Sequence, residues 1–164
     1  MTAGDVEIGI EAPDGADVLP LVEALDAYLS GLYPAESNHL LDVAALAAPD
    51  CRFAVARAGG RPVGCGALRI DPAGYGELKR MYVRPQTRGL GLGRRLLAFL
   101  EAVAREEGLD RLCLETGIHQ PEAIALYRAT GYVERGPFAG YPPDPLSLFM
   151  EKRLPAPAPA PDHA

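Results

Sequence analysis

A glycine-rich segment flanked by arginines constrains the fold more strongly than any other part of this chain. Residues 82–106 read YVRPQTRGLGLGRRLLAFLEAVARE, in which three glycines alternate with leucines. Beyond them, apolar residues recur at helical spacing, which predicts a helix from Leu90 to Glu107 that ends at Gly108. The preceding strand is predicted to stop before Pro85, because proline cannot donate to a sheet. The sequence therefore predicts a strand, a glycine loop and a helix in direct succession.

This arrangement suits the binding of a phosphate group. The first N–H groups of a helix have no partner within it, and the helix dipole places positive charge there. Glycine lets a ligand approach the backbone closely, and nearby arginines add full charges. Gly93 is followed by arginine rather than by Lys-Ser/Thr, which disfavours a Walker loop, and the G-x-G-x-G spacing disfavours a dinucleotide fingerprint. A purely structural glycine turn remains the alternative.

The remaining pattern predicts an α/β fold with a mixed central sheet flanked by helices. Alternating and β-branched stretches predict strands, 3.6-residue periodicity predicts helices, and Gly59-Gly60 predicts a hairpin turn. A second short helix within residues 37–48 would be capped by Ser37 or Asn38. The predicted order is βααβββαβαββ, from segments 6–12, 16–33, 37–48, 52–70 (two strands), 75–85, 90–107, 111–116, 120–131, 132–136 and 146–154.

Length and composition indicate one globular domain over residues 1–154, with a disordered Pro/Ala tail at 155–164. The N-terminus lacks the basic and apolar regions of a signal peptide, and no apolar run reaches 18 residues, so we expect a cytoplasmic protein without membrane contact. A net charge of −6 argues against nucleic-acid binding. The three cysteines include no Cys-x-x-Cys pair, so we expect neither a disulfide framework nor a bound metal.

Two stretches are similar to those of the GNAT (Gcn5-related) N-acetyltransferase family. YVRPQTRGLGLGRRLL resembles its acetyl-CoA loop, whose Gln/Arg-x-x-Gly-x-Gly/Ala core is met by Arg88, Gly91 and Gly93. QPEAIALYRATGY resembles a later helix of the family that carries a Leu-Tyr pair. The resemblance covers roughly residues 6–153. It implies a sheet that splays open, with acetyl-CoA as cosubstrate held where two parallel strands part.

The resemblance also implies which residues hold acetyl-CoA. Backbone N–H groups of the loop would bind the pyrophosphate, and the end of the preceding strand would pair with the pantetheine arm. Gln120 stands where many members have asparagine, which leaves a cofactor contact there open. The implied cofactor residues are Met81, Tyr82, Val83, Arg88, Gly89, Leu90, Gly91, Leu92, Gly93, Arg94 and Gln120.

In this family the amine attacks the thioester directly, without an acyl-enzyme, so we expect no nucleophilic cysteine. Tyr127 is the candidate acid, because a phenol can protonate the leaving thiolate. Glu77 is the candidate base, and the alternative is a structural pair with Lys79 or Arg80. His119 and water are rival bases. Glu115 could face the cleft or pair with an arginine.

The acceptor is expected to be a cationic small molecule or peptide amine. Residues 1–50 hold ten acids and no Lys or Arg, and the two segments that form the acceptor walls in the family lack basic residues. Glu36, His39, Tyr141 and Asp144 are the candidate acceptor residues. Alternatively, these acids only maintain solubility, the chain transfers another acyl group, or it is a non-catalytic acyl-CoA-binding regulatory module. A monomer and a homodimer are both compatible with the sequence.

Overall fold

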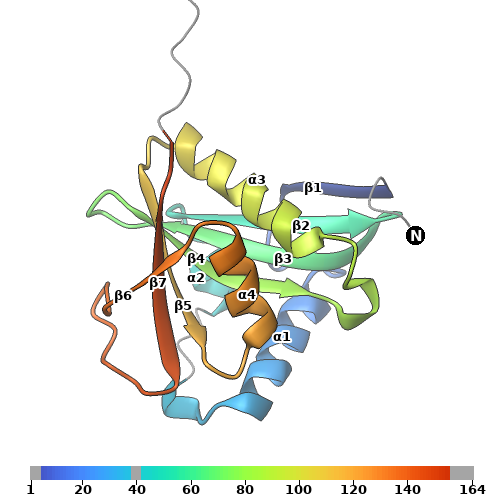
Figure 1. Ribbon diagram of the computed structural model, residues 1–164. Coiled ribbons are helices and arrows are strands. Elements are labelled where there is room, and N and C mark those ends of the chain that lie inside the picture. Colours follow the sequence, from blue (N-terminus) through green and yellow to red (C-terminus); the bar gives the residue numbers. More distant parts are fainter. Residues whose placement is uncertain (1–4, 38–41, 156–164) are drawn as a thin grey trace, which may run out of the picture.

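The computed structural model describes residues 5–37 and 42–155, and its sheet contains seven strands in the order β1-β2-β3-β4-β5-β7-β6 (Figure 1). The predicted element order and the mixed α/β class are confirmed. The predictions for the tail from residue 156 onward, for Asn38 and for His39 concern residues outside the described ranges. The elements are β1 (Val6–Ile10), α1 (Leu19–Leu32), α2 (Val43–Leu46), β2 (Cys51–Ala58), β3 (Arg61–Ile70), β4 (Gly76–Val83), α3 (Leu92–Glu106), β5 (Arg111–Gly117), α4 (Pro121–Ala129), β6 (Val133–Arg135) and β7 (Ser147–Arg153).

Helices cover both faces of the sheet, which explains why its central strands are apolar on both sides. Successive side chains of a strand point to opposite faces. Phe53 and Val55 of β2 accordingly pack with α1 and α2, whereas Ala54 and Ala56 belong to the cluster that contains the leucines of α3. Figure 1 shows α3 and α4 on one face and α1 on the other. No helix among the described residues is long and apolar enough to span a bilayer.

Local sequence signals account for most of the element boundaries. Gly59 and Gly60 both have positive φ, at 55° and 84°, as the two-residue turn between β2 and β3 requires. One predicted boundary was wrong. Helix α2 is capped by Asp42, whose carboxylate accepts a hydrogen bond from the N–H of Ala45 at 2.8 Å, and not by Ser37. Ser37 instead ends a short 3-10 helix over Ala35–Ser37.

Strands β4 and β5 run parallel and then part, as the expected splayed sheet requires. They pair over three positions, from Gly76 opposite Leu112 to Leu78 opposite Leu114. Beyond that point β4 continues against β3 as far as Val83, while β5 continues against β7. Each strand thus keeps one neighbour and loses the other, which exposes backbone groups on both sides of the gap.

A bulge lies in β4 where the strands separate. Lys79 pairs with Ala67 and Tyr82 pairs with Cys65, so Arg80 and Met81 together face Gly66. Arg80 has a φ of 59°, which is uncommon for a residue with a side chain. A Cβ on Gly66 would lie 2.5 Å from the sulfur of Met81, so glycine is needed there. The bulge changes which side chains of β4 face the gap.

Candidate active site

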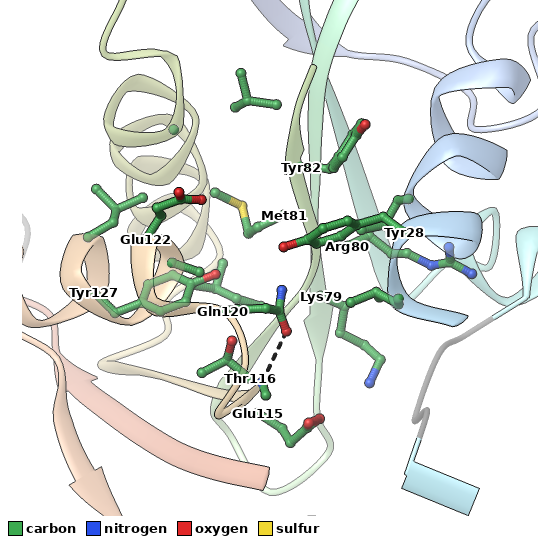
Figure 2. Close-up of a pocket in the computed structure, with 18 of the residues that line it drawn as sticks. Tyr28, Lys79, Arg80, Met81, Tyr82, Glu115, Thr116, Gln120, Glu122 and Tyr127 are labelled. Atoms are coloured by element: carbon green, nitrogen blue, oxygen red, sulfur yellow. Dashed lines mark hydrogen bonds between the residues drawn. The ribbon is translucent and has the colours of Figure 1, made fainter. Parts of the chain in front are cut away.

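The gap between β4 and β5 opens into a cleft of about 600 Å³. Its walls come from α1, from the separated ends of β4 and β5, from the glycine loop with the start of α3, and from α4. Figure 2 shows the side chains of Tyr28 and Tyr127 pointing toward one another across it. The residues that line it include Leu25, Tyr28, Leu29, Tyr33, Ser37, Glu77, Lys79, Arg80, Met81, Tyr82, Val83, Arg88, Gly89, Gly91, Leu92, Gly93, Arg94, Glu115, Gln120, Leu126, Tyr127, Tyr141 and Leu146.

The glycine loop has the backbone geometry of an anion-binding turn. Gly89 and Gly91 have φ values of 89° and 71°, and Gly91 is the left-handed N-cap of α3. A Cβ built on either would meet no atom within 4 Å, so the space above them is open to a ligand. Gly93 differs, because its Cβ would lie 3.1 Å from Leu126 of α4. Two glycines therefore form an open cradle at the start of a fifteen-residue helix, and the third allows close packing.

Most of the residues that the resemblance assigned to acetyl-CoA line this cleft. They are Met81, Tyr82 and Val83 at the end of β4, Gln120, and the loop from Arg88 to Arg94 apart from Leu90. Leu90 is partly buried against the core that α3 shares with the sheet. Arg88 lies 3.6 Å from Glu122 in an exposed pair, which leaves its guanidinium near the loop.

Gln120 holds together three segments at the base of the cleft. Its side-chain oxygen accepts hydrogen bonds from the N–H of Gly117 at 3.1 Å and from the hydroxyl of Tyr33 at 3.3 Å. The Tyr33 hydroxyl in turn accepts from the N–H of His119 at 3.0 Å. The end of α1 is thereby joined to the connection between β5 and α4. This network gives Gln120 a structural role that its position as a helix N-cap did not indicate.

Tyr127, the predicted acid, is 5% exposed and lies on the cleft-facing side of α4. Its ring packs edge-on against Tyr132, with the ring centroids 5.6 Å apart. Burial, followed by the nearby Glu115 carboxylate, raises the pKa of the Tyr127 phenol above its usual range. The phenol therefore carries its proton at neutral pH, which is the state that a proton donor needs.

Glu77, the predicted base, is 2% exposed, and its two side-chain hydrogen bonds are both accepted by one carboxylate oxygen, Oε2. Its carboxylate accepts hydrogen bonds from Lys79 Nζ at 3.1 Å and from the Tyr141 hydroxyl at 2.5 Å. Arg69 approaches it at 3.7 Å. The sequence left open whether Glu77 pairs with a cation of β4, and the structure shows that it pairs with Lys79.

Glu115 lies at the end of β5 with its side chain in the cleft (Figure 2). The Ser147 hydroxyl donates to its carboxylate at 3.4 Å. Burial raises the pKa of Glu115 to about 7, against a lowering effect of Lys79. Two carboxylates thus occupy one cleft in different environments: Glu77 is held by Lys79 and Tyr141, whereas Glu115 is held only by the long hydrogen bond from Ser147 among the described contacts.

His119, the rival base, is exposed and stacks on Tyr33, with the ring centroids 5.6 Å apart. It is not among the described residues that line the cleft.

The residues predicted for the acceptor walls divide into two groups. Tyr141 lines the cleft, whereas Glu36 and Asp144 lie outside its described lining. Asp144 accepts hydrogen bonds from the Ser37 hydroxyl at 2.6 Å and from the N–H of Leu146 at 2.8 Å. It therefore connects the segment after α1 with the loop before β7.

The premise that cations are absent from these walls was wrong. Lys79 of β4 donates to the Tyr141 hydroxyl at 2.5 Å and lies 5.2 Å from the centre of its ring. The error arose because the wall segments contain no basic residue themselves, while the neighbouring strand supplies one. Tyr28 and Tyr33 are among the cleft residues to which the sequence assigned no role, and Lys79 was considered only as a partner of Glu77. Tyr28 lies on α1 and is 36% exposed within the cleft, and nothing in its position in the sequence indicated this.

Comparisons with known proteins agree with this geometry. The model of the acetyltransferase (GNAT) family matches residues 19–132. An IAA acetyltransferase of Azospirillum brasilense is 58% identical over 92% of this chain and 99% of its own length. The uncharacterized N-acetyltransferase YsnE of Bacillus subtilis is 34% identical over 91% of this chain and 100% of its own.

Solved structures show the same architecture. An acyl-CoA N-acyltransferase structure from Klebsiella pneumoniae superposes with a TM-score of 0.78 at 45% identity, covering 91% of this chain and 97% of that one. A PaiA N-acetyltransferase of Thermoplasma acidophilum, solved with coenzyme A, shares the fold with a TM-score of 0.67 at 20% identity, over 90% and 99% of the two chains. The separated parallel strands, the glycine cradle and these matches lead to one conclusion: the chain belongs to the GNAT family of acetyltransferases.

Proposed function

We propose that this protein transfers the acetyl group of acetyl-CoA directly to a primary amine. The observation that carries the proposal is the open cradle of Gly89 and Gly91 at the start of α3, continuous with a cleft that holds both a protonated phenol and a titratable carboxylate. Backbone N–H groups from Arg88 to Arg94 would bind the pyrophosphate, and the unpaired edge of β4 at Met81–Val83 would bind the pantetheine arm.

In the proposed reaction the amine nitrogen attacks the thioester carbonyl, the new C–N bond forms and the C–S bond breaks. The ammonium form of the acceptor must first lose a proton to a base, and the leaving thiolate must gain one from an acid. The nitrogen loses its second proton as the amide forms, which replaces the proton that the acid gives up. We assign the first role to Glu115, because a carboxyl with a pKa near 7 accepts protons at neutral pH. We assign the second to Tyr127, whose phenol stays protonated.

Glu77 stands as the alternative base, since it lies in the same cleft. Its pairing with Lys79 and Tyr141 favours a positioning role, because the two donors bind one oxygen of the carboxylate and join β4 to the loop before β7.

The cysteines support direct transfer rather than an acyl-enzyme. Cys65 is fully buried, and burial raises the pKa of its thiol to about 12. Burial also raises the pKa of Cys51 to about 11 and raises that of Cys113. A thiol is a nucleophile in its thiolate form, so these three groups stay unreactive near neutral pH.

The test is release of coenzyme A from acetyl-CoA in the presence of a panel of amines, with the acetylated product identified by mass spectrometry. We expect acetyl-CoA to be consumed only when an amine is present. A non-catalytic regulatory module would instead bind coenzyme A without turnover on any amine. Propionyl-CoA and succinyl-CoA in the same assay distinguish acetyl transfer from transfer of another acyl group.

A further inference from the structure

The part of the cleft walled by α1 and by the loop before β7 is apolar and aromatic, and the charged side chains beside it, Lys79 and Arg80, are paired with acids. This acceptor end, as we call it, is lined by Leu25, Tyr28, Leu29, Tyr33, Tyr141 and Leu146. Leu25, Leu29 and Tyr33 are buried together and pack with Leu146. Tyr28 differs, because its ring remains 36% exposed while facing the cleft (Figure 2). An aromatic ring left open within a cleft offers a contact surface to an apolar ligand.

The cations near this end are not available to a carboxylate. Lys79 donates to Glu77 at 3.1 Å and to Tyr141 at 2.5 Å, and its side chain is 10% exposed. Arg80 pairs with Asp26, and its side chain is 3% exposed. A bound carboxylate would have to replace a buried partner, which leaves that partner as an uncompensated charge. Amino acids and other anionic acceptors are therefore disfavoured.

The acidic side chains Glu77 and Asp144 also have hydrogen-bond partners already, which disfavours a polyamine as the acceptor. Glu77 already holds Lys79, and Asp144 already holds the Ser37 hydroxyl and the N–H of Leu146. Among the described residues that line the cleft, Glu77 therefore offers no unpaired site to a second ammonium group of the acceptor. Glu115 remains for a single amine, since the hydrogen bond that its carboxylate accepts from the Ser147 hydroxyl is long, at 3.4 Å.

We infer that the acceptor is a primary monoamine carried on an aromatic or other apolar body, with its nitrogen at Glu115 and its body against Tyr28. This inference rests on the proposed amine acetylation and narrows it to one acceptor class. The paired charges around Lys79 and Arg80 position the walls of the cleft and do not bind the acceptor.

The test compares four amine probes that differ in charge, polarity and apolar surface. 2-Phenylethylamine is the apolar monoamine, L-phenylalanine adds a carboxylate to the same body, putrescine adds a second ammonium group, and ethanolamine removes the apolar body. We expect kcat/KM for 2-phenylethylamine to exceed that of each other probe by about 10-fold or more, the scale of one desolvated group. A higher kcat/KM for phenylalanine, putrescine or ethanolamine would overturn the inference.

Variants of Tyr28 test whether the apolar body of the acceptor binds against this side chain. Tyr28→Ala should raise KM for 2-phenylethylamine by about 10-fold with little change in KM for acetyl-CoA, whereas Tyr28→Phe should retain wild-type values. Val133→Ala is the matched control, because Val133 is an exposed apolar side chain on β6, outside the described lining of the cleft. An unchanged KM in Tyr28→Ala would contradict the assignment.

A binding measurement separates this inference from the proposed function. Calorimetric titration of the coenzyme A complex with 2-phenylethylamine and with L-phenylalanine requires no turnover. If no amine is acetylated, the proposed function fails, yet preferential binding of 2-phenylethylamine that is lost in Tyr28→Ala would still support the apolar acceptor end. Equal or weaker binding of 2-phenylethylamine than of phenylalanine would overturn it.

Discussion

The hydroxyl of Tyr33 occupies the space that a side chain on residue 117 would need. A Cβ built on Gly117 would lie 1.8 Å from that oxygen and 2.0 Å from the ring carbon that bears it. Glycine at this position lets the end of α1 approach the end of β5 closely enough for Tyr33, Gln120 and His119 to share hydrogen bonds. Because residue 117 has no side chain, these contacts can form at the base of the cleft.

Gly117→Ala should therefore destabilise the protein. The displaced Tyr33 ring must move and take its hydrogen bonds with it, so we expect a loss of about 1–3 kcal/mol, the range of overpacked cores. Urea unfolding measures it. Gly9→Ala on β1 is the control, since a Cβ there meets no atom within 4 Å. Equal stability of the two variants would show that Tyr33 repacks without cost.

The glycine cradle predicts a separation of stability from cofactor binding. Gly91→Val and Gly108→Val both place a branched side chain at positive φ, with open space around each Cβ, so both should lower Tm. Only Gly91→Val should weaken acetyl-CoA binding, by about 10-fold or more, equivalent to about 1.4 kcal/mol. Calorimetric titration measures it. A normal Kd in folded Gly91→Val would place the phosphate site elsewhere.

Tyr127→Phe removes a hydroxyl and little volume. We expect kcat to fall roughly 10- to 1,000-fold with a modest change in KM for acetyl-CoA, the range for a lost proton donor. Tyr132→Phe is the matched control, because Tyr132 packs against Tyr127 but donates to Glu101, outside the described cleft lining. If the chemical step limits the rate and both variants still keep the wild-type kcat, then Tyr127 has only a packing role.

The raised pKa of Glu115 predicts the pH dependence of the reaction. A base works when deprotonated, so kcat/KM should rise with pH through about 7 and fall below it. Glu115→Gln should lower the rate and remove this limb from the pH profile. The same substitution in Glu77 tests the alternative base, and removal of the limb by Glu77→Gln alone would transfer the role to Glu77.

The effect of Glu115 on stability should change with pH in the opposite sense to its effect on activity: activity rises with pH, whereas the stabilisation falls. Because the folded-state pKa lies above the ordinary value of 4.5, the folded protein holds this proton more tightly than the unfolded chain. The contribution of Glu115 to stability is thus present below pH 4.5 and is lost as pH rises toward 7. Glu115→Gln should accordingly raise Tm at pH 8 relative to wild type, and an unchanged or lower Tm would contradict the burial of this charge.

The sequence by itself determined the order of elements and the place of the glycine loop, because both depend on local chemistry. Hydrophobic periodicity identifies helices and strands within short windows, and glycines mark positions that need positive φ or close approach. Gly59-Gly60 and the three glycines around the start of α3 were informative for this reason. The assignment of that loop to acetyl-CoA came from the resemblance of two stretches and not from spacing alone.

Only the tertiary structure decided which side chains meet across the cleft. Lys79 reaches Tyr141 from 62 positions away in the sequence, and the bulge at Arg80 changes which residues of β4 face the gap. A count of charges along the wall segments could not include a lysine from a neighbouring strand. The environments of Glu77 and Glu115 likewise depend on burial and on partners distant in the chain. Electrostatic interactions act through space, so the charge of a site follows from the fold rather than from any one segment.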